Sequence, residues 1–124
     1  MTAAGAHVLI VEDNELVSGA LRILFESVDY RVSTAASIAD ATSLVAQDPA
    51  ALVLLDLTLP DGDGLTLVGP AKSAGARTIV ALTGRDDDAT RRRCIDAGCA
   101  EVLLKPVPVK ELLARAAGWV GATD

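Results

Sequence analysis

A short apolar run, followed by a turn and a longer amphipathic segment, occurs five times along this chain and restricts its fold more than any other feature. The apolar runs cover residues 7–11, 30–34, 51–55, 78–82 and 100–104, and the amphipathic segments cover roughly residues 14–27, 38–47, 64–74, 87–97 and 109–120. Strands that alternate with helices form right-handed crossovers, which produce a parallel sheet with helices on both faces. The sequence therefore predicts an α/β fold.

Two of the apolar runs are expected at the centre of the sheet. The run at residues 51–55 is Ala-Leu-Val-Leu-Leu and the run at residues 8–11 is Val-Leu-Ile-Val, without polar alternation. Such runs are typical of strands buried on both faces. Five strands of this kind can be wound in the order 2-1-3-4-5, with ligands bound outside their carboxyl ends. We expect a flavodoxin-like (βα)5 doubly wound fold, with residues 1–124 forming a single domain.

Local signals support these helix boundaries. Asn14 can cap the first helix, and Ser37 with Asp40 three residues later reads as a capping box. Gly75 and Gly98 follow two of the helical segments, where a left-handed residue favours termination. The boundaries and the periodicity therefore agree.

Composition and charge exclude several classes of protein. The net charge is -6, with 17 acidic and 11 basic residues, and the one basic run, residues 91–93, has acids on both sides. Direct nucleic-acid binding needs a concentrated basic surface, so we expect none. The two cysteines have no metal-binding spacing and are expected in the core. With no signal peptide and no apolar run long enough to span a bilayer, a cytoplasmic domain without membrane insertion is expected.

Polar residues follow four of the five predicted strands. They are Glu12 and Asp13, then Asp56, then Thr83 with Gly84, and finally Lys105 with Pro106. Each of these residues alone is common in loops or at the start of a helix. The carboxyl ends of parallel strands meet at one edge, however, so we expect these side chains to lie together.

The residue types at this edge indicate phosphoryl chemistry. Three converging carboxylates repel one another unless a cation lies among them, and Mg²⁺ is the hard cation that such oxygen ligands favour. A carboxylate such as Asp56 can attack phosphorus and form an aspartyl phosphate. The Lys105 ammonium and the Thr83 hydroxyl could then stabilise the phosphoryl oxygens.

Four motifs together resemble the CheY-like receiver domain of two-component response regulators, over nearly the whole chain. They are Val-Leu-Ile-Val-Glu12-Asp13, Leu-Leu-Asp56-Leu-Thr-Leu-Pro60-Asp-Gly-Asp-Gly64, Ala-Leu-Thr83-Gly84 and Leu-Leu-Lys105-Pro106. The resemblance implies that Asp56 accepts a phosphoryl group from the phosphohistidine of a sensor histidine kinase or histidine phosphotransfer protein. It also implies a signalling switch, not an enzyme, that catalyses only its own phosphorylation and dephosphorylation.

The same resemblance assigns roles to the neighbouring residues. Asp13, Asp56 and the backbone carbonyl of Thr58 would bind Mg²⁺, with Glu12 acting through a water. Lys105 would pair with the phosphoryl oxygens, Thr83 would move to hydrogen-bond one of them, and a cis bond before Pro106 would shape the loop. A downstream target protein is implied, while homodimerisation and excision from a longer protein stay open.

One departure from the family pattern concerns the switch. Val102 stands three residues before Lys105, where the family commonly has Tyr or Phe, and Val107 stands where Phe is frequent. A valine has few rotamers and no ring to swing inward. We assign Gly84, Val102 and Pro106 to the switch, and expect phosphorylation to alter the loop after Thr83 and the helix at 87–97 without an aromatic.

The first helix carries two apolar stripes. We expect Val17, Leu21 and Leu24 to face the sheet, while Leu16, Gly19 and Ile23 form the second stripe. Receiver domains commonly contact their kinase through this helix, so the resemblance makes Leu16 and Ile23 candidate partner-binding residues. A wide core-facing surface explains the second stripe equally well.

Other functions are compatible with parts of this pattern. A phosphohydrolase of the haloacid-dehalogenase type also forms an aspartyl phosphate, but it needs a second acid where this chain has Thr58. A flavodoxin needs a phosphate loop after the first strand, where this chain has acidic residues 12, 13 and 15. An inactive receiver is a third alternative. Thr58 and Arg85 flank the predicted site and could tune hydrolysis, and His7, at the opposite edge, is expected to be structural.

Overall fold

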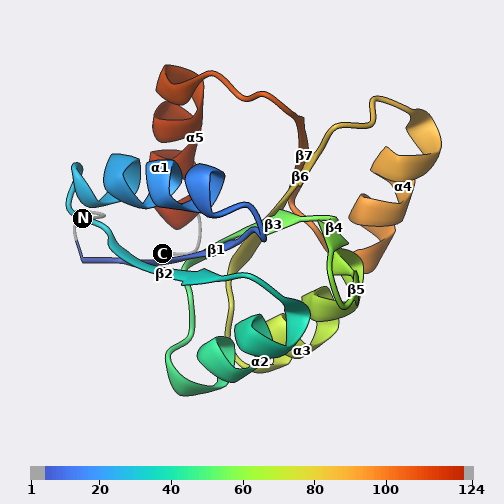
Figure 1. The fold of residues 1–124 in the computed structure, drawn as a ribbon, viewed down its shortest axis with the longest axis horizontal. Coiled ribbons are helices and arrows are strands. Elements are labelled where there is room, and N and C mark those ends of the chain that lie inside the picture. The colour runs from blue at the N-terminus through green and yellow to red at the C-terminus, as the bar shows by residue number, and fades with distance from the viewer. Residues whose placement is uncertain (1–4, 122–124) are drawn as a thin grey trace.

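The computed structural model describes residues 5–121 and contains a five-stranded parallel sheet with helices on both faces (Figure 1). The sheet strands are β1 (His7–Val11), β2 (Arg31–Ala35), β3 (Leu52–Asp56), β6 (Thr78–Thr83) and β7 (Glu101–Leu104). The helices are α1 (Glu15–Glu26), α2 (Ile38–Gln47), α3 (Val68–Ser73), α4 (Asp88–Ala97) and α5 (Val109–Gly121). The strand order β2-β1-β3-β6-β7 is the predicted 2-1-3-4-5 order, which is thereby confirmed. Within residues 5–121, no helix combines the length and apolarity needed to cross a membrane.

Alternate residues of the central strands pack into two separate cores. Leu9 and Val11 join the core that α2, α3 and α4 cover, whereas Val8 and Ile10 join the core beneath α1 and α5. All five residues of β1 and of β3 are buried. Because both faces are covered, the carboxyl edge is where these strands can present polar side chains.

Helix ends follow the expected capping chemistry. The Asn14 side chain accepts hydrogen bonds from the amides of Leu16 and Val17 at 3.0 and 3.3 Å, and the Ser37 hydroxyl accepts one from Asp40 at 3.1 Å. These bonds satisfy amides that no helical carbonyl can reach.

The amino end of α2 has a second cap that the sequence analysis did not anticipate. The Asp61 carboxylate accepts hydrogen bonds from the amides of Ile38 and Ala39 at 2.9 and 3.0 Å. These amide bonds lower the pKa of Asp61 below its ordinary value. The loop that follows β3 is thereby attached to α2.

The third helical segment differs from its prediction. Instead of one helix over residues 64–74, the chain forms a hairpin of β4 (Thr58–Leu59) and β5 (Gly62–Asp63), then the 3-10 helix η1 (Gly64–Leu67), and only then α3. The Asp63 side chain accepts a hydrogen bond from the amide of Leu65 at 3.0 Å, which caps η1. Pro70 is accommodated because it lies in the first turn of α3, where its missing N–H costs little.

The face that α1 turns to the sheet is also different. Ser18 and Phe25 are its buried residues and Leu21 packs against the same core, whereas Val17 is 39% exposed. The prediction that Val17 faces the sheet is therefore wrong. Phe25, beside Tyr30 with ring centroids 5.7 Å apart, sets the rotation of the helix because it is the largest fully buried side chain that α1 contributes to this core.

The edge strand β2 is covered at one point by a side chain from α1. The Arg31 amide donates to the Ala6 carbonyl, and the Ala35 carbonyl accepts from the Glu12 amide, so both residues turn backbone groups toward β1. Successive residues of a strand point their backbone groups in opposite directions, so the N–H and C=O of Val32 face away from β1. The Arg22 guanidinium donates a hydrogen bond of 3.1 Å to the Val32 carbonyl oxygen. This free edge is therefore partly satisfied from within the chain.

Candidate functional site

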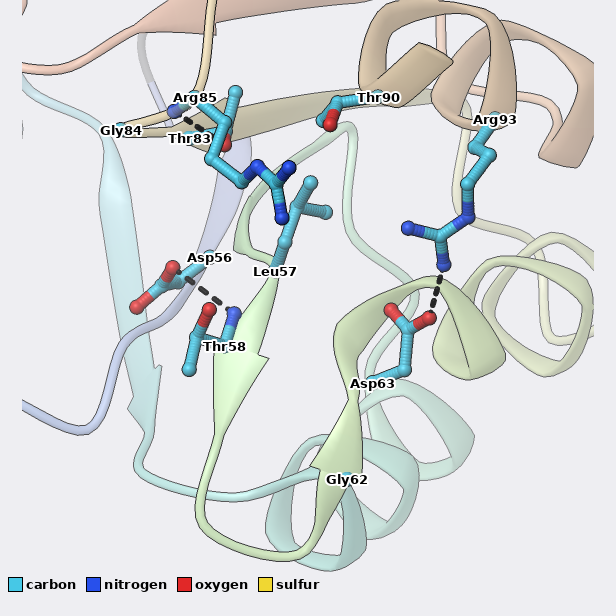
Figure 2. Close-up of a pocket in the computed structure, with 10 residues that line it drawn as sticks. All are labelled: Asp56, Leu57, Thr58, Gly62, Asp63, Thr83, Gly84, Arg85, Thr90 and Arg93. Atoms are coloured by element: carbon cyan, nitrogen blue, oxygen red, sulfur yellow. Dashed lines mark hydrogen bonds and ion pairs between the residues drawn. The ribbon is translucent and has the colours of Figure 1, made fainter.

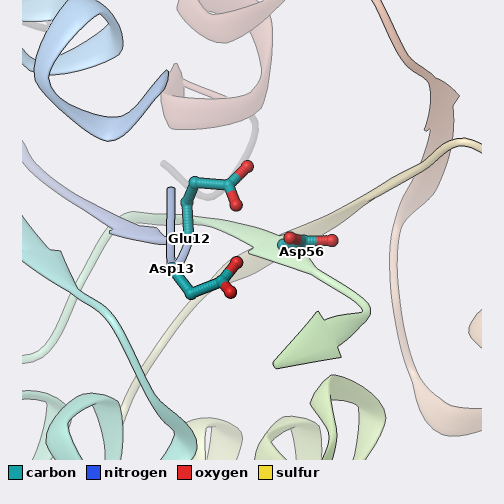
Figure 3. Close-up of side chains that lie close together, drawn as sticks. All are labelled: Glu12, Asp13 and Asp56. Carbon is teal, nitrogen blue, oxygen red and sulfur yellow. The ribbon is translucent and has the colours of Figure 1, made fainter. Parts of the chain in front are cut away.

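Three carboxylates meet at the carboxyl edge of the two central strands. One carboxylate oxygen from each of Glu12, Asp13 and Asp56 lies within 4.8 Å of the other two, and Figure 3 shows the three side chains. The pairing of Val11 with Leu55 brings the ends of β1 and β3 level, which places the carboxylates side by side. Glu12 and Asp56 are only 5% and 8% exposed, so little water screens their mutual repulsion.

Lys105 supplies the compensating charge. Its Nζ lies 2.9 Å from Glu12 Oε1 and 3.4 Å from Asp56 Oδ2. Burial alone lowers the pKa of this ammonium, but the hydrogen bond to Glu12 and the charge of Asp56 outweigh that effect and raise the pKa. Lys105 is therefore fully protonated near neutral pH and partly neutralises the acidic cluster.

The donor set fits a hard divalent cation. The cluster offers carboxylate oxygens alone, which suit Mg²⁺, whereas His7, Cys94 and Cys99 belong to other parts of the fold. Thr58, whose carbonyl is a predicted Mg²⁺ ligand, begins β4 two residues after Asp56. Its amide donates a hydrogen bond of 3.3 Å to Asp56 Oδ1. This fit is consistent with the predicted cofactor.

Thr83 lies at the end of β6, one strand away from Asp56. Its side chain is buried, and its Oγ1 accepts a hydrogen bond of 3.0 Å from the amide of Arg85. Leu82 pairs with Asp56 in the sheet, so Thr83 and the exposed Gly84 extend past that residue on the neighbouring strand. The predicted residues Asp13, Asp56, Thr83 and Lys105 therefore all gather at one edge.

A cleft of 590 Å³ opens beside Asp56, on the side of α4 (Figure 2). Its lining residues are Asp56, Leu57, Thr58, Gly62, Asp63, Thr83, Gly84, Arg85, Thr90 and Arg93. Asp63, Thr90 and Arg93 belong to this lining although no sequence pattern indicated that they contribute to the site. Their helical spacing could have placed Thr90 and Arg93 on one face of α4, but not against this cleft.

The predicted switch residues occupy different surroundings. Val102 is buried in the same core as Cys94 and Cys99, so an aliphatic side chain fills this position. Pro106 follows a cis peptide bond, as predicted, and is exposed. Gly84 lines the cleft. How these residues respond to phosphorylation stays a prediction.

Leu16 and Ile23 lie outside the site. They are 86% and 71% exposed, so the alternative in which this stripe of α1 is part of a wide core face is wrong. His7 is buried at the opposite edge of the sheet, where its Nε2 lies 2.8 Å from the Ser33 hydroxyl. That position agrees with the structural role expected for His7.

Comparison with known proteins gives a consistent assignment. A family model described as the response regulator receiver domain matches residues 8–117. The TorCAD operon transcriptional regulatory protein TorR of Escherichia coli O157:H7 is 33% identical over 109 residues, which are 88% of this chain and 47% of TorR. The chain thus spans about half the length of the curated relatives it matches.

Solved structures support the same assignment. The non-phosphorylated HemR receiver domain from Leptospira biflexa superposes with a TM-score of 0.85 at 32% identity, covering 94% of both chains. The receiver domain of the sensor histidine kinase PA1611 from Pseudomonas aeruginosa PAO1, with magnesium coordinated in its active-site cleft, gives 0.83 at 29% identity and covers 95% of this chain and 99% of that one. These findings do not support the alternative of a haloacid-dehalogenase-type phosphohydrolase. The chain belongs to the response regulator receiver domain family and is a two-component signalling receiver.

Proposed function

We propose that Asp56 accepts a phosphoryl group, in the cytoplasm, from the phosphohistidine of a sensor histidine kinase or histidine phosphotransfer protein. Asp13, Asp56 and the Thr58 carbonyl would hold Mg²⁺, and Glu12 would contribute through a water. The observation that carries the proposal is the convergence of three carboxylates with Lys105 at the carboxyl edge of β1 and β3. No other group of described residues combines a nucleophile, a cation and a metal-binding set in this way.

The transfer step follows from these groups. One Asp56 carboxylate oxygen attacks the phosphorus, the P–N bond to the donor imidazole breaks, and its electron pair stays on the imidazole nitrogen. Mg²⁺, when bound, neutralises charge on the carboxylates and on the phosphoryl oxygens. Lys105, already 3.4 Å from Asp56 Oδ2, contacts the oxygens that the phosphoryl group adds there.

Thr83 and the cleft complete the proposed cycle. The Thr83 hydroxyl accepts a hydrogen bond from the Arg85 amide at 3.0 Å, and its own O–H can be donated to a phosphoryl oxygen at the same time. Arg85 lies two residues before Asp87, the cap of α4, so a movement of Thr83 toward a phosphoryl oxygen carries the bonded Arg85 amide with it and alters the loop that leads into α4. The cleft lined by Thr58 and Arg85 gives water a route to the aspartyl phosphate, whose hydrolysis resets the switch.

The phosphorylation test uses intact-protein mass spectrometry. The protein is incubated with acetyl phosphate and Mg²⁺, beside an Asp56→Asn variant and a metal-free sample. We expect one phosphoryl increment that requires both Asp56 and Mg²⁺. Absence of the increment in the wild-type protein, with beryllofluoride binding also absent, would contradict the proposal.

The proposed kinase contact is the exposed α1 stripe that includes Leu16 and Ile23. An Ile23→Glu substitution should slow transfer from a kinase that phosphorylates this domain, while leaving phosphorylation by acetyl phosphate unchanged. Ile95→Glu on α4 is the matched control, since Ile95 is a 49% exposed apolar residue on another helix. Equal transfer rates to both variants would exclude this surface.

The proposed switch works without an aromatic at position 102. Superposed structures of the free and beryllofluoride-bound domain should differ in the loop from Gly84 to Asp87 and in α4, with Val102 keeping its rotamer. An α4 region that superposes without change would contradict this mechanism.

A further inference from the structure

We infer that Arg93 is a positioning residue, which holds the segment after Asp56 in place for Mg²⁺ through its ion pair with Asp63. The inference rests on the proposed function, because it concerns the metal affinity of the same site. Arg93 belongs to α4 and its guanidinium pairs with the Asp63 carboxylate across the outer part of the cleft (Figure 2). Neither residue contacts Asp56 directly.

A short series of contacts leads from Asp63 to Asp56. Asp63 in β5 is the cross-strand partner of Thr58 in β4. Thr58 in turn donates its amide to Asp56 Oδ1 at 3.3 Å (Figure 2). The strand that Arg93 holds is therefore paired with the strand that carries the predicted carbonyl ligand of Mg²⁺.

Gly64 provides a second connection of the same segment to Asp56. Its amide donates a hydrogen bond of 2.9 Å to the Leu57 carbonyl. A Cβ at Gly64 would lie 2.4 Å from the Asp56 carbonyl oxygen, so the two backbones are in direct contact. Because Asp63 immediately precedes Gly64, displacement of Asp63 moves backbone that touches Asp56.

The hairpin needs support from outside, which α2 gives at Asp61 and α4 gives at Asp63. Strands β4 and β5 have two residues each, too few to be stable alone, and both residues of β5 are exposed. Helix α4 is capped at its start by Asp87, whose carboxylate accepts a hydrogen bond from the Thr90 amide at 2.7 Å. Further along the helix, the buried Cys94 packs it against the core. Asp63 Oδ1 already caps η1, which leaves Oδ2 for the planar guanidinium of Arg93.

The sign of the effect separates positioning from simple electrostatics. Arg93 carries a positive charge near an acidic metal site, so its charge alone repels Mg²⁺, and removing it would tighten binding. Positioning predicts the opposite, since loss of Arg93 releases the hairpin and weakens binding. The direction of the change therefore decides between the two.

The test is a titration with Mg²⁺ alone, followed by ¹⁵N amide shifts of the whole chain, for wild type, Arg93→Gln, Arg93→Lys and Arg92→Gln. Arg92 is the matched control because it is the adjacent exposed arginine on α4, and the structure gives it no ion pair among residues 5–121. An exposed ion pair changes an equilibrium by up to about five-fold, so Arg93→Gln should weaken Mg²⁺ binding about two- to five-fold. Arg93→Lys should recover part of this loss, and Arg92→Gln should show none.

Each outcome decides the inference. Mg²⁺ binding to Arg93→Gln that equals or exceeds binding to Arg92→Gln overturns it. If Arg93→Gln folds poorly, Arg93→Lys, Asp63→Asn and their double variant form a cycle in which non-additive losses of affinity support the inference and additive losses overturn it. A wild-type chain without Mg²⁺-dependent shifts overturns the proposed metal site together with this inference, whereas a shift that is equal in wild type and Arg93→Gln overturns the inference alone.

Discussion

Gly64→Ala should disturb both the stability of the domain and the position of Asp56. The added Cβ would lie 2.4 Å from the Asp56 carbonyl oxygen and 3.1 Å from the Leu57 Cα. Both neighbours are backbone atoms, of the last residue of β3 and of the residue that follows it, so no side chain can rotate away to make room. The backbone of η1 or of the Asp56 loop has to move.

The expected size of the effect follows from these distances. Overpacking of this kind costs about 1–3 kcal/mol. The lower flexibility of alanine in the unfolded chain offsets about 0.4–1 kcal/mol of that cost. The net loss is about 1–2 kcal/mol, which corresponds to a fall in Tm of roughly 3–10 °C for a domain of this size. A displaced Asp56 should also slow phosphorylation, by roughly 10- to 100-fold.

Urea unfolding and phosphorylation by acetyl phosphate measure the two effects. Gly118→Ala is the matched control, because Gly118 lies within α5 and an added Cβ there meets no atom within 4 Å. This control should stabilise the protein by about 0.5–1 kcal/mol through helix propensity, and leave phosphorylation unchanged. If Gly64→Ala is as stable as Gly118→Ala, the close backbone contact does not constrain the site and the reasoning fails.

Three further predictions concern titratable groups. Lys105→Met should lower Tm at neutral pH. Because the pKa of Lys105 is raised in the folded state, its stabilising effect is present below the ordinary lysine pKa of 10.5 and is lost as the pH rises above that value, so the difference in Tm should fade there. A difference in Tm that stays constant across this pH range would refute the prediction. Asp61→Ala should lower Tm at pH 7 but not well below the ordinary pKa of 3.8, where the α2 cap of the wild type is protonated; equal losses at both pH values would contradict the cap. Burial raises the pKa of Cys99 to about 11 and also that of Cys94, so a thiol reagent at pH 8 should modify both slowly in the native state and rapidly in denaturant; fast native labelling would be inconsistent with the buried thiols.

The sheet and its acidic edge could be predicted because each depends on local patterns. Strands without polar alternation had to be central, and the carboxyl ends of parallel strands had to meet. Glu12, Asp56 and Lys105 were therefore expected together although 93 residues separate Glu12 from Lys105. Tertiary geometry was not needed for that inference.

The predictions that the structure did not confirm concern features that depend on tertiary contacts. The β4–β5 hairpin has too few residues for a periodic signal, and its place depends on the contact of Gly64 with Asp56. The rotation of α1 depends on Phe25, which a period of 3.6 residues does not distinguish from Leu24. The Arg93–Asp63 pair joins residues 30 apart, and it exists only because α4 lies beside this hairpin.

The bond from Arg22 to the Val32 carbonyl has a consequence for the behaviour of many copies at high concentration. An exposed edge strand is a template on which a strand of another molecule can add, and repeated addition produces fibrils. At Val32 the acceptor that an incoming amide would need already has a donor, and removing that donor would require α1 to release a side chain. Addition of a further strand at β2 is therefore disfavoured at this residue. Arg22→Ala should increase fibril formation under conditions that leave the domain folded.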